Sequence, residues 1–596
     1  MINPGQTPVI RRLVLALFLV ILAAPAHAAE LSDLRFVETA SLPGLKPPDL
    51  RGLPQVLGAG DARLYRLIFT RQQAGDWAAA DALIEQISDT RLMGHVLFQR
   101  LMHPTAYRAS YQELKSWLAL YRDQPGADRI YRLAMHRRPK GADAPVKPED
   151  DGPLQIIVGS LGQAQLSDAF ANGDPKVWRT VLSHIADGRL AESESYLAAV
   201  GKGGPHAPEA VDAAYALLSR GYYHQKNDSK AYDLADKAAR RSGDAAPETH
   251  WVAGLAAWRL GHFSEALPHF VAVADNAKAP ATDRAASAYW AARTALRLGR
   301  PAEMSRWLRT AAGLPRTFYG LVARQTLGID DRRSLRGLKF DSDALEALLS
   351  NRRIARAVAL LQVGQDDLAR AEFGELGGRI EPGQLEALLL LLDRARMAPE
   401  AYEIADKVFR HVGEETTYGV IDVGLYPIPS WQPTDGFRVD RALLFAIARK
   451  ESRFDPDARN PSGASGLMQL MPLTARAMAE KGEGKGRLLE PDYNMELAQR
   501  YVEHLQQDPV IRDDLLKLLV GYNAGPGNLR RWQAQLGEAG ENDPLLFMES
   551  LPSRETRSYL RRVLANYWIY RKRLGQPTPS LASIAAGEWP AYESLD

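Results

Sequence analysis

Apolar residues between about positions 55 and 410 recur three or four places apart, a spacing that predicts amphipathic helices. Short turns rich in Gly, Asp, Asn and Pro interrupt them. Residues 251–270 read W-x-x-G-x-A-A-x-x-L-G-x-x-x-x-A-x-x-x-F, and 289–308 repeat the aromatic start, the small residues and the Leu-Gly turn. Residues 216–235, with a turn at Asn227-Asp228 that we expect to end the first helix, are a looser third copy. The period predicts stacked helix pairs, and hence an all-α superhelix.

Two stretches break this helical pattern. Residues 139–153 are rich in Pro, Gly and charge, which is typical of a linker. Residues 424–436 contain Pro427, Pro429 and Pro433, and the chain after them is richer in clustered Gly, Asn and aromatic residues. We therefore expect an α-helical superhelical domain over residues 29–424 and a second domain over residues 425–596.

The first 28 residues have the organisation of a secretory signal peptide. Arg11-Arg12 form a basic start, residues 13–24 form an apolar run, and Ala26-His27-Ala28 match a cleavage site. The apolar run is short for a transmembrane helix, so we expect cleavage before Ala29 and no integral membrane anchor afterwards. An uncleaved N-terminal anchor remains the alternative interpretation.

Composition narrows the class of protein. A chain of 596 residues is longer than one compact core requires, and 46% hydrophobic with 24% charged residues is typical of a soluble protein. A formal net charge of +2 argues against a nucleic-acid binder, and the short basic run Arg571-Lys572-Arg573 is expected to be a solvated helix face. The chain has no Cys, so it contains no disulfide and no thiolate metal site. An exported, cysteine-free chain fits a bacterial periplasm.

Glu451 is the first candidate for chemistry. Asp440 is a suitable N-cap for a helix that runs to about Ser452, which places Glu451 in the last turn. There the carbonyl end of the helix disfavours a negative charge, and Phe454 adds desolvation. Both effects raise the pKa of a carboxyl group, as a general acid requires near neutral pH. On position alone, a solvated Glu at a helix end remains the simpler interpretation.

Two further segments place polar side chains on tight turns. The turn over residues 461–466 is followed by a short apolar run interrupted by Gln469, whose amide needs hydrogen-bond partners that a sugar could supply. Pro472 then restarts a helix. Residues 521–527 form a Gly-rich corner between two helices and present Tyr522 and Asn523.

Other interpretations of this region are weaker. Asp455 and Asp457 begin like a calcium loop, but Arg459 stands at the next ligand position and Asn460 where Gly is required. Either Asp could instead be a second catalytic carboxylate, although both are better placed to cap the turn. The His residues show no zinc-binding spacing, so we predict no metal and no cofactor.

Taken together, four ordered motifs resemble the signature of soluble lytic transglycosylases, which have a catalytic domain like goose-type lysozyme. They are Glu451-Ser452, Gly466-Leu467-Met468-Gln469, Tyr522-Asn523-Ala524-Gly525 and the run from Leu551 to Tyr559. They cover about residues 430–575. The N-terminal helices resemble that family's long helical superhelix more loosely, with Phe318-Tyr319-Gly320 among the better matches.

The resemblance implies cleavage of the β-1,4 bond between N-acetylmuramic acid and N-acetylglucosamine in peptidoglycan. Glu451 would be the single acid/base and would direct the muramyl C6 hydroxyl onto C1, giving a 1,6-anhydro product. The resemblance also implies substrate-binding roles for Ser452, Met468, Gln469, Tyr522 and Asn523, and a supporting role for Glu555 as a buried acid near the cleft.

Two departures and two alternatives stay open. Asn460 stands where relatives often carry Ser close to the catalytic residue, and Gly521 stands where Ala is more usual. The second domain could be a goose-type hydrolase that consumes water. The chain could also be a non-catalytic helical scaffold that grips glycan strands and binds wall-synthesis or secretion proteins. A Glu at position 451 favours an enzyme over the scaffold.

Overall fold

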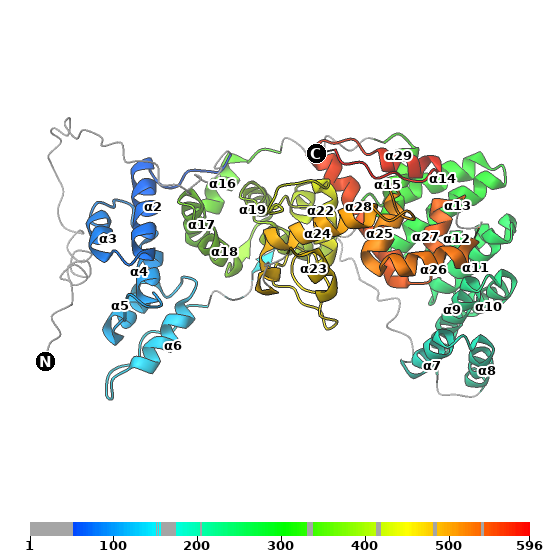
Figure 1. The fold of residues 1–596 in the computed structure, drawn as a ribbon, viewed down its shortest axis with the longest axis horizontal. Coiled ribbons are helices and arrows are strands. Elements are labelled where there is room, and N and C mark those ends of the chain that lie inside the picture. Colours follow the sequence, from blue (N-terminus) through cyan, green and yellow to red (C-terminus); the bar gives the residue numbers. More distant parts are fainter. Residues whose placement is uncertain are drawn as a thin grey trace. The chain divides into compact units, whose positions relative to one another are not determined.

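The computed structural model is built almost wholly of α-helices (Figure 1). It describes residues 52–150, 152, 154–156, 175–202, 206–329, 338–412, 419–480, 485–537 and 542–595. The expected signal peptide over residues 1–28 lies outside these ranges. None of the described helices combines the length and the apolar character needed to cross a lipid bilayer. The all-α prediction is confirmed.

The chain divides into two units, each assembled from two separate segments. Unit 1 contains residues 1–155 and 345–380, and unit 2 contains residues 156–344 and 381–596. Unit 1 holds α2 (Ala59–Gln73), α3 (Trp77–Ile84), α4 (Met93–Leu101), α5 (Tyr111–Tyr121), α6 (Ala127–Arg137), α17 (Arg352–Gln362), α18 (Asp366–Gly374) and β2 (Arg379–Ile380). The elements β1 (Gln155–Ile156) and α16 (Ser342–Leu349) cross the points where the chain passes between units.

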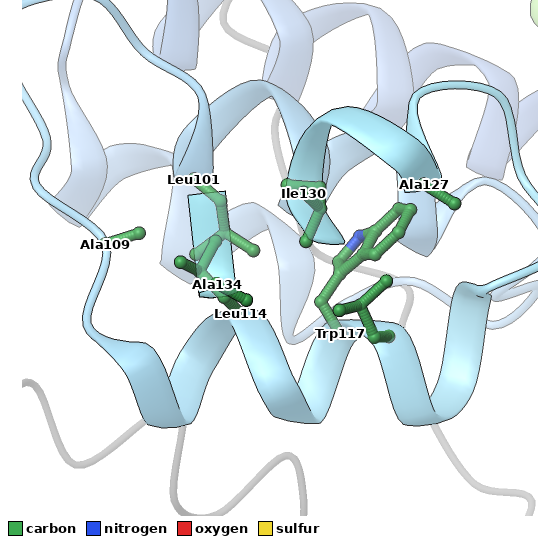
Figure 2. Close-up of a cluster of buried hydrophobic side chains, with 8 residues drawn as sticks. Leu101, Ala109, Leu114, Trp117, Ala127, Ile130 and Ala134 are labelled. Carbon is green, nitrogen blue, oxygen red and sulfur yellow. The ribbon is translucent and has the colours of Figure 1, made fainter. Parts of the chain in front are cut away.

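Unit 1 has an aromatic and aliphatic core and a buried charged cluster. Figure 2 shows the core, in which Trp117 and Ile130 lie among the buried side chains of α5 and α6. The two segments of the unit are joined by the buried carboxylate of Glu372. It accepts a hydrogen bond from Arg356 Nε at 2.6 Å and contacts His95 Nε2 at 2.7 Å. Each buried charge therefore has a partner, as a buried ion pair requires.

Unit 2 begins with the predicted helix pairs. They are α7 (Pro175–Ala186), α8 (Leu190–Val200), α9 (Pro208–His224), α10 (Asp228–Ser242), α11 (Pro247–Arg259), α12 (Phe263–Asp275), α13 (Ala281–Arg297), α14 (Pro301–Ala312) and α15 (Phe318–Thr326). From α9 to α15 each helix packs against the next in chain order. We call α9–α15 the helix stack. Gly261 and Gly299 take the left-handed conformation between paired helices, with φ of 76° and 68°.

One detail of the repeat prediction is wrong. In the looser copy, Asn227 does not end the first helix. Lys226 takes the left-handed position there, with φ of 60°. Asn227 instead caps the second helix, α10, because its side chain accepts a hydrogen bond from the Lys230 amide at 3.2 Å.

The rest of unit 2 carries the candidate site. Its elements are α19 (Pro382–Arg394), α20 (Ala398–Val412), α21 (Val420–Leu425), α22 (Arg441–Glu451), α23 (Pro472–Met478), the 3₁₀ helix η2 (Lys485–Leu489), α24 (Pro491–Gln506), α25 (Leu515–Ala524), α26 (Pro526–Leu536), α27 (Pro544–Ser550), α28 (Arg554–Leu574) and α29 (Pro579–Ala586). The Pro-containing stretch between α21 and α22 is irregular, as predicted.

The long helix α28 packs along α22, and its basic end corrects a prediction. Arg571, Lys572 and Arg573 are buried rather than solvated. Arg571 pairs with Asp440, and Arg573 donates to the carbonyl of Val423 at 2.6 Å. These cations satisfy a buried carboxylate and a buried carbonyl, which is why they are found inside the protein.

Candidate active site

Glu451 is the last residue of α22, as the sequence predicted. The Asp440 side chain begins this helix by accepting a hydrogen bond from the Ala442 amide at 2.9 Å. Glu451 is half-buried. Burial raises the pKa of Glu451 to about 7; the cation of Lys450 opposes this rise and the negative charge of Glu555 adds to it. Glu451 can therefore hold a proton near neutral pH, which is the property of a general acid.

The chain turns sharply just after Glu451. Arg453 and Phe454 both take positive φ, 57° and 67°, a conformation that is uncommon for residues other than Gly. Phe454 is fully buried, and its ring lies 6.4 Å from that of Tyr402 in α20. Such backbone strain persists only when the surroundings fix it, and it often accompanies functional sites.

The polar residues after this turn serve the loop itself. Asp455 and Asp457 are exposed, and Asp455 accepts a hydrogen bond from the Asp457 amide at 2.9 Å. Asn460 is also exposed, and its side-chain oxygen accepts from the Ala464 amide at 2.9 Å. These contacts make all three turn residues. Among the described residues there is no group of His, Cys, Asp or Glu that could hold a metal ion.

Gln469 is half-buried and also takes a positive φ of 47°. Its amide nitrogen donates to the carbonyls of Ala458 and Gly466, both at 2.9 Å. The loop therefore uses both amide protons, and the side-chain oxygen is the atom left for a ligand. Ser452 is similar, because its buried hydroxyl donates to the Ala448 carbonyl at 3.1 Å.

Asn494, which the sequence analysis did not single out, holds the Gly466–Met468 loop. It is fully buried in α24 and accepts a hydrogen bond from the Met468 amide at 2.7 Å. Its amide nitrogen donates to the carbonyls of Leu488 at 2.9 Å and Ser465 at 3.3 Å. A lone Asn within an amphipathic helix gives no sequence signal for this role, since its partners lie in a distant loop.

Tyr522 and Asn523 lie at the end of α25, on the predicted corner, where Gly525 has a φ of 83°. The Tyr522 hydroxyl donates to the Met468 carbonyl at 3.3 Å, and Asn523 accepts from the Thr556 hydroxyl at 2.8 Å. These two bonds join the second, third and fourth motifs. The pKa of the Tyr522 phenol is raised well above its usual value by burial and by the nearby carboxylate of Glu451.

Tyr559 is a further group beside Glu451 that the sequence analysis quoted without a role. It is fully buried in α28, and its hydroxyl has no hydrogen-bond partner among the described residues. The Lys450 ammonium lies 5.5 Å from the centre of its ring. Burial and then the charge of Glu451 raise the pKa of Tyr559 well above its usual value. A buried phenol without a partner costs free energy unless a ligand or water satisfies it.

Glu555 differs from its predicted environment. It lies in the first turn of α28 and is exposed, so the expectation of a buried acid is wrong. The positive end of the helix dipole stabilises a carboxylate in this turn without burial. Its charge nevertheless acts on Glu451. Among the residues predicted for the site, the structure therefore places Tyr522 and Glu555 within electrostatic range of Glu451.

Comparison with known proteins identifies relatives of part of this chain. Residues 430–544 match the family model described as the transglycosylase SLT domain. Over 309 residues, which are 50% of this chain, it is 32% identical to the soluble lytic murein transglycosylase of Salmonella typhimurium and 31% identical to that of Escherichia coli K12. The matched stretch spans 45% of each of these relatives.

A solved structure with similar helices is the 70 kDa soluble lytic transglycosylase from Escherichia coli. It is 21% identical with a TM-score of 0.43, over 89% of this chain and 88% of that one. The family match and the two sequence relatives confirm the resemblance: residues 430–544, which contain the first three of the four motifs, match the transglycosylase SLT domain, and the chain is similar over half its length to soluble lytic murein transglycosylases.

Proposed function

We propose that this protein is a lytic transglycosylase that cleaves the β-1,4 bond between N-acetylmuramic acid and N-acetylglucosamine in peptidoglycan. The observation that carries the proposal is Glu451, a half-buried carboxyl at a helix end with a pKa raised to about 7. It lies in the matched domain, beside the phenols of Tyr522 and Tyr559.

In the first step, protonated Glu451 gives its proton to the glycosidic oxygen while the bond from that oxygen to C1 breaks. Positive charge then develops on the muramyl ring, and the carboxylate of Glu451 faces it. In the second step, Glu451 takes the proton of the muramyl C6 hydroxyl as O6 bonds to C1. The products are a free 4-hydroxyl and a 1,6-anhydro end, and no water is consumed.

The carboxylates near Glu451 are poorly placed to activate a water molecule, which favours the internal nucleophile. A hydrolase needs a second carboxylate, either to activate water or to attack C1. Asp455 and Asp457 are exposed and Asp455 is engaged in its own turn, while Glu555, whose charge acts on Glu451, is exposed at the start of α28. A C6 hydroxyl already tethered to the reacting ring has the advantage of proximity and needs no such base beyond Glu451.

The remaining site residues would hold the glycan. The free oxygen of Gln469 and the side chain of Met468 would line the sugar subsites, and Ser452 could accept one hydrogen bond from substrate. Tyr522 and Asn523 would lie near an acetamido group. Glu555, being exposed, would meet a substrate peptide or an Arg side chain. These contacts suit a polar glycan with amide groups.

We also propose the cellular setting and the domain division. A cleavable signal peptide over residues 1–28 would export the chain to the periplasm, where peptidoglycan lies. The superhelical domain over residues 29–424 would steer the catalytic domain over residues 425–596 along glycan strands. Wall-synthesis or secretion proteins are the partner class that such a helical surface would bind.

The products of digestion test the proposal. The protein should release 1,6-anhydromuramyl products, each one water lighter than the hydrolytic product, from purified peptidoglycan. In heavy-oxygen water these products should carry no label. Label at C1 with accumulating reducing ends would instead identify a goose-type hydrolase. Glycan binding without any release would identify a scaffold.

A further inference from the structure

The segment that leads into α28 is held by the helix stack as well as by residues of α28 itself. Glu549 and Ser550 end α27, and Leu551, Pro552 and Ser553 connect them to α28. Glu549 and Leu551 are fully buried, and Ser550 is nearly so. The start of α28 then supplies Glu555 and Tyr559 beside Glu451. The position of the segment therefore bears directly on the site.

Glu549 is the centre of the contact with the stack. Its carboxylate accepts a hydrogen bond from the Tyr319 hydroxyl of α15 at 2.7 Å and from Arg561 Nε of α28 at 2.9 Å. Its second oxygen accepts from the Arg561 NH2 group. Trp290 of α13 donates in turn to the Tyr319 oxygen at 3.0 Å. Every acceptor atom in this series of hydrogen bonds is buried and has a donor, which fixes the geometry of the series.

The next residue, Ser550, is held by α9. Its hydroxyl lies 2.9 Å from the Tyr223 hydroxyl, and its carbonyl lies 3.2 Å from Nδ1 of His224. Burial, followed by nearby Arg557, lowers the pKa of His224 well below its usual value, so a neutral imidazole can donate its Nδ1 proton to this carbonyl. Two consecutive residues are therefore held directly by two helices of the stack, α15 and α9, and α13 supports the first of these contacts through Tyr319.

A second set of hydrogen bonds links this segment to α28 and to the loops of the site. Buried Arg557 donates to the carbonyls of Leu551 and Pro552, the latter at 3.2 Å, and so closes the connection onto α28. Ser553 caps α28 by accepting from the Thr556 amide at 3.1 Å. The Thr556 hydroxyl donates to Asn523, whose neighbour Tyr522 contacts the Met468 carbonyl.

We propose that Glu549 is a positioning residue, through which the helix stack sets the place of α28 and thereby of Glu555 and Tyr559 beside Glu451. The proposal rests on the proposed function for its kinetic part. It gives the stack a positioning role in catalysis, in addition to steering the catalytic domain along glycan. Because a displacement of about 1 Å at a reacting site can cost about 100-fold in rate, a small movement of α28 should be measurable.

The ion pair of Asp422 and Arg316 provides a matched control. Like Glu549, Asp422 is fully buried, and its carboxylate receives two hydrogen bonds from one Arg, at 2.6 and 2.8 Å. It ties the segment before α15 to α21, and among the described residues none of the hydrogen bonds of the Asp422 carboxylate reaches α27 or α28. The adjacent Val423 carbonyl contacts Arg573 at the far end of α28, so the loss of the pair should weaken the fold as the loss of Glu549 does, while Glu549 still holds the start of α28.

The experiment uses the full chain with Glu549→Gln, Tyr319→Phe and Asp422→Asn. Hydrogen exchange by mass spectrometry follows residues 551–561, thermal unfolding follows stability, and initial rates on peptidoglycan give kcat and KM. We expect Glu549→Gln to increase exchange in residues 551–561 and to lower kcat about 10- to 100-fold with little change in KM. Tyr319→Phe, which keeps the charge pair, should do the same to a smaller extent.

For Asp422→Asn we expect a similar loss of thermal stability, faster exchange near α21, and an unchanged kcat. The proposal is overturned if Glu549→Gln leaves exchange and kcat as in the wild type, or if Asp422→Asn lowers kcat equally. Should Glu549→Gln fail to fold, Tyr319→Phe decides by the same measures. If the wild type releases no anhydromuramyl product, the proposed function fails, while the exchange data still decide whether Glu549 positions α28.

Discussion

The hydroxyl of Thr556 donates a hydrogen bond to the side-chain oxygen of Asn523 over 2.8 Å. Thr556 lies in the first turn of α28 and Asn523 in the last turn of α25, so this bond joins two helix ends from different motifs. Thr556 also donates its amide to the Ser553 cap. The Asn523 amide is thereby oriented, with its nitrogen available to a ligand.

Replacing this hydroxyl with a methyl group tests that orientation. Thr556→Val keeps the shape of the side chain but leaves the Asn523 oxygen without its donor, so we expect a loss of about 1–2 kcal/mol in the free energy of unfolding and a clear fall in kcat. Thr310→Val is the control, because its hydroxyl bonds only its own helix, at the exposed Arg306 carbonyl. An equal kcat in both variants would show that the orientation of Asn523 does not affect catalysis.

Exchange of Glu451 for its amide should remove catalysis and leave the fold intact. Glu451→Gln cannot give or take a proton, so cleavage of peptidoglycan should fall by orders of magnitude. In the wild type, the rate should decline as the pH rises through about 7, since the acid is then lost. A Gln variant that clears peptidoglycan at the wild-type rate would show that another group is the acid.

The raised pKa of Glu451 also predicts how the free energy of unfolding depends on pH. Its pKa is raised on folding, so the folded state binds the proton more tightly and loses stability as the pH rises from the unfolded value of 4.5 to about 7. Glu451→Gln should therefore be more stable than the wild type at pH 8, by about 1–3 kcal/mol. At pH 4 this advantage should vanish. Chemical denaturation at both pH values measures it, and a constant difference between the two proteins would contradict the assignment.

Gly466 is predicted to be irreplaceable for steric reasons. A Cβ atom there would lie 2.4 Å from the Leu488 carbonyl oxygen and 2.5 Å from the Asn494 amide nitrogen. Gly463 shares a positive φ, but its Cβ would meet nothing closer than Pro472 at 3.9 Å. Gly463→Ala should cost about 1–2 kcal/mol for its conformation alone, and Gly466→Ala clearly more.

Equal unfolding free energies for the two Ala variants would show that the loop adapts around a methyl group. In that case the contact of Asn494 with the Met468 loop would be looser than its hydrogen-bond distances indicate.

The proposed boundary near residue 425 predicts that a fragment over residues 425–596 folds on its own, melts cooperatively and keeps some activity. Its melting temperature should nevertheless be lower than that of the full chain. Contacts with the stack are lost, among them the ring of Phe318 stacked 5.2 Å from Trp568. A circular dichroism melt measures this, and a fragment that aggregates would place the boundary elsewhere.

Local rules were sufficient for much of the fold. The capping residue Asp440, the helix that ends at Glu451 and the corner at Gly525 follow from propensities that act over a few residues. The direction of the pKa shift of Glu451 was also predicted correctly, although the causes in the structure are burial and the charge of Glu555 rather than the helix end. The resemblance also led us to expect that residues of the other motifs lie near the acid.

Long-range partners were not predictable. Arg571 looks like a surface cation until Asp440 is known to lie opposite it. Glu555 looks like a buried acid by analogy with its family but is exposed at a helix start. Asn494 and Glu549 act through residues far away in the chain, and nothing in their own neighbourhood signals it. A single sequence does not show which residues Asn494 and Glu549 contact.

The antiparallel packing of α22 on α28 fixes a register at both ends. Asp440 and Arg571 meet at one end, and Lys450 lies over Tyr559 at the other. One residue inserted into either helix would turn everything beyond it by about 100° and shift it by about 1.5 Å. The acid would then face away from its phenol even if every side chain were retained. Over these two helices, the spacing between residues constrains the site as strictly as their identity, so we expect length variation to be tolerated only in the loops outside them.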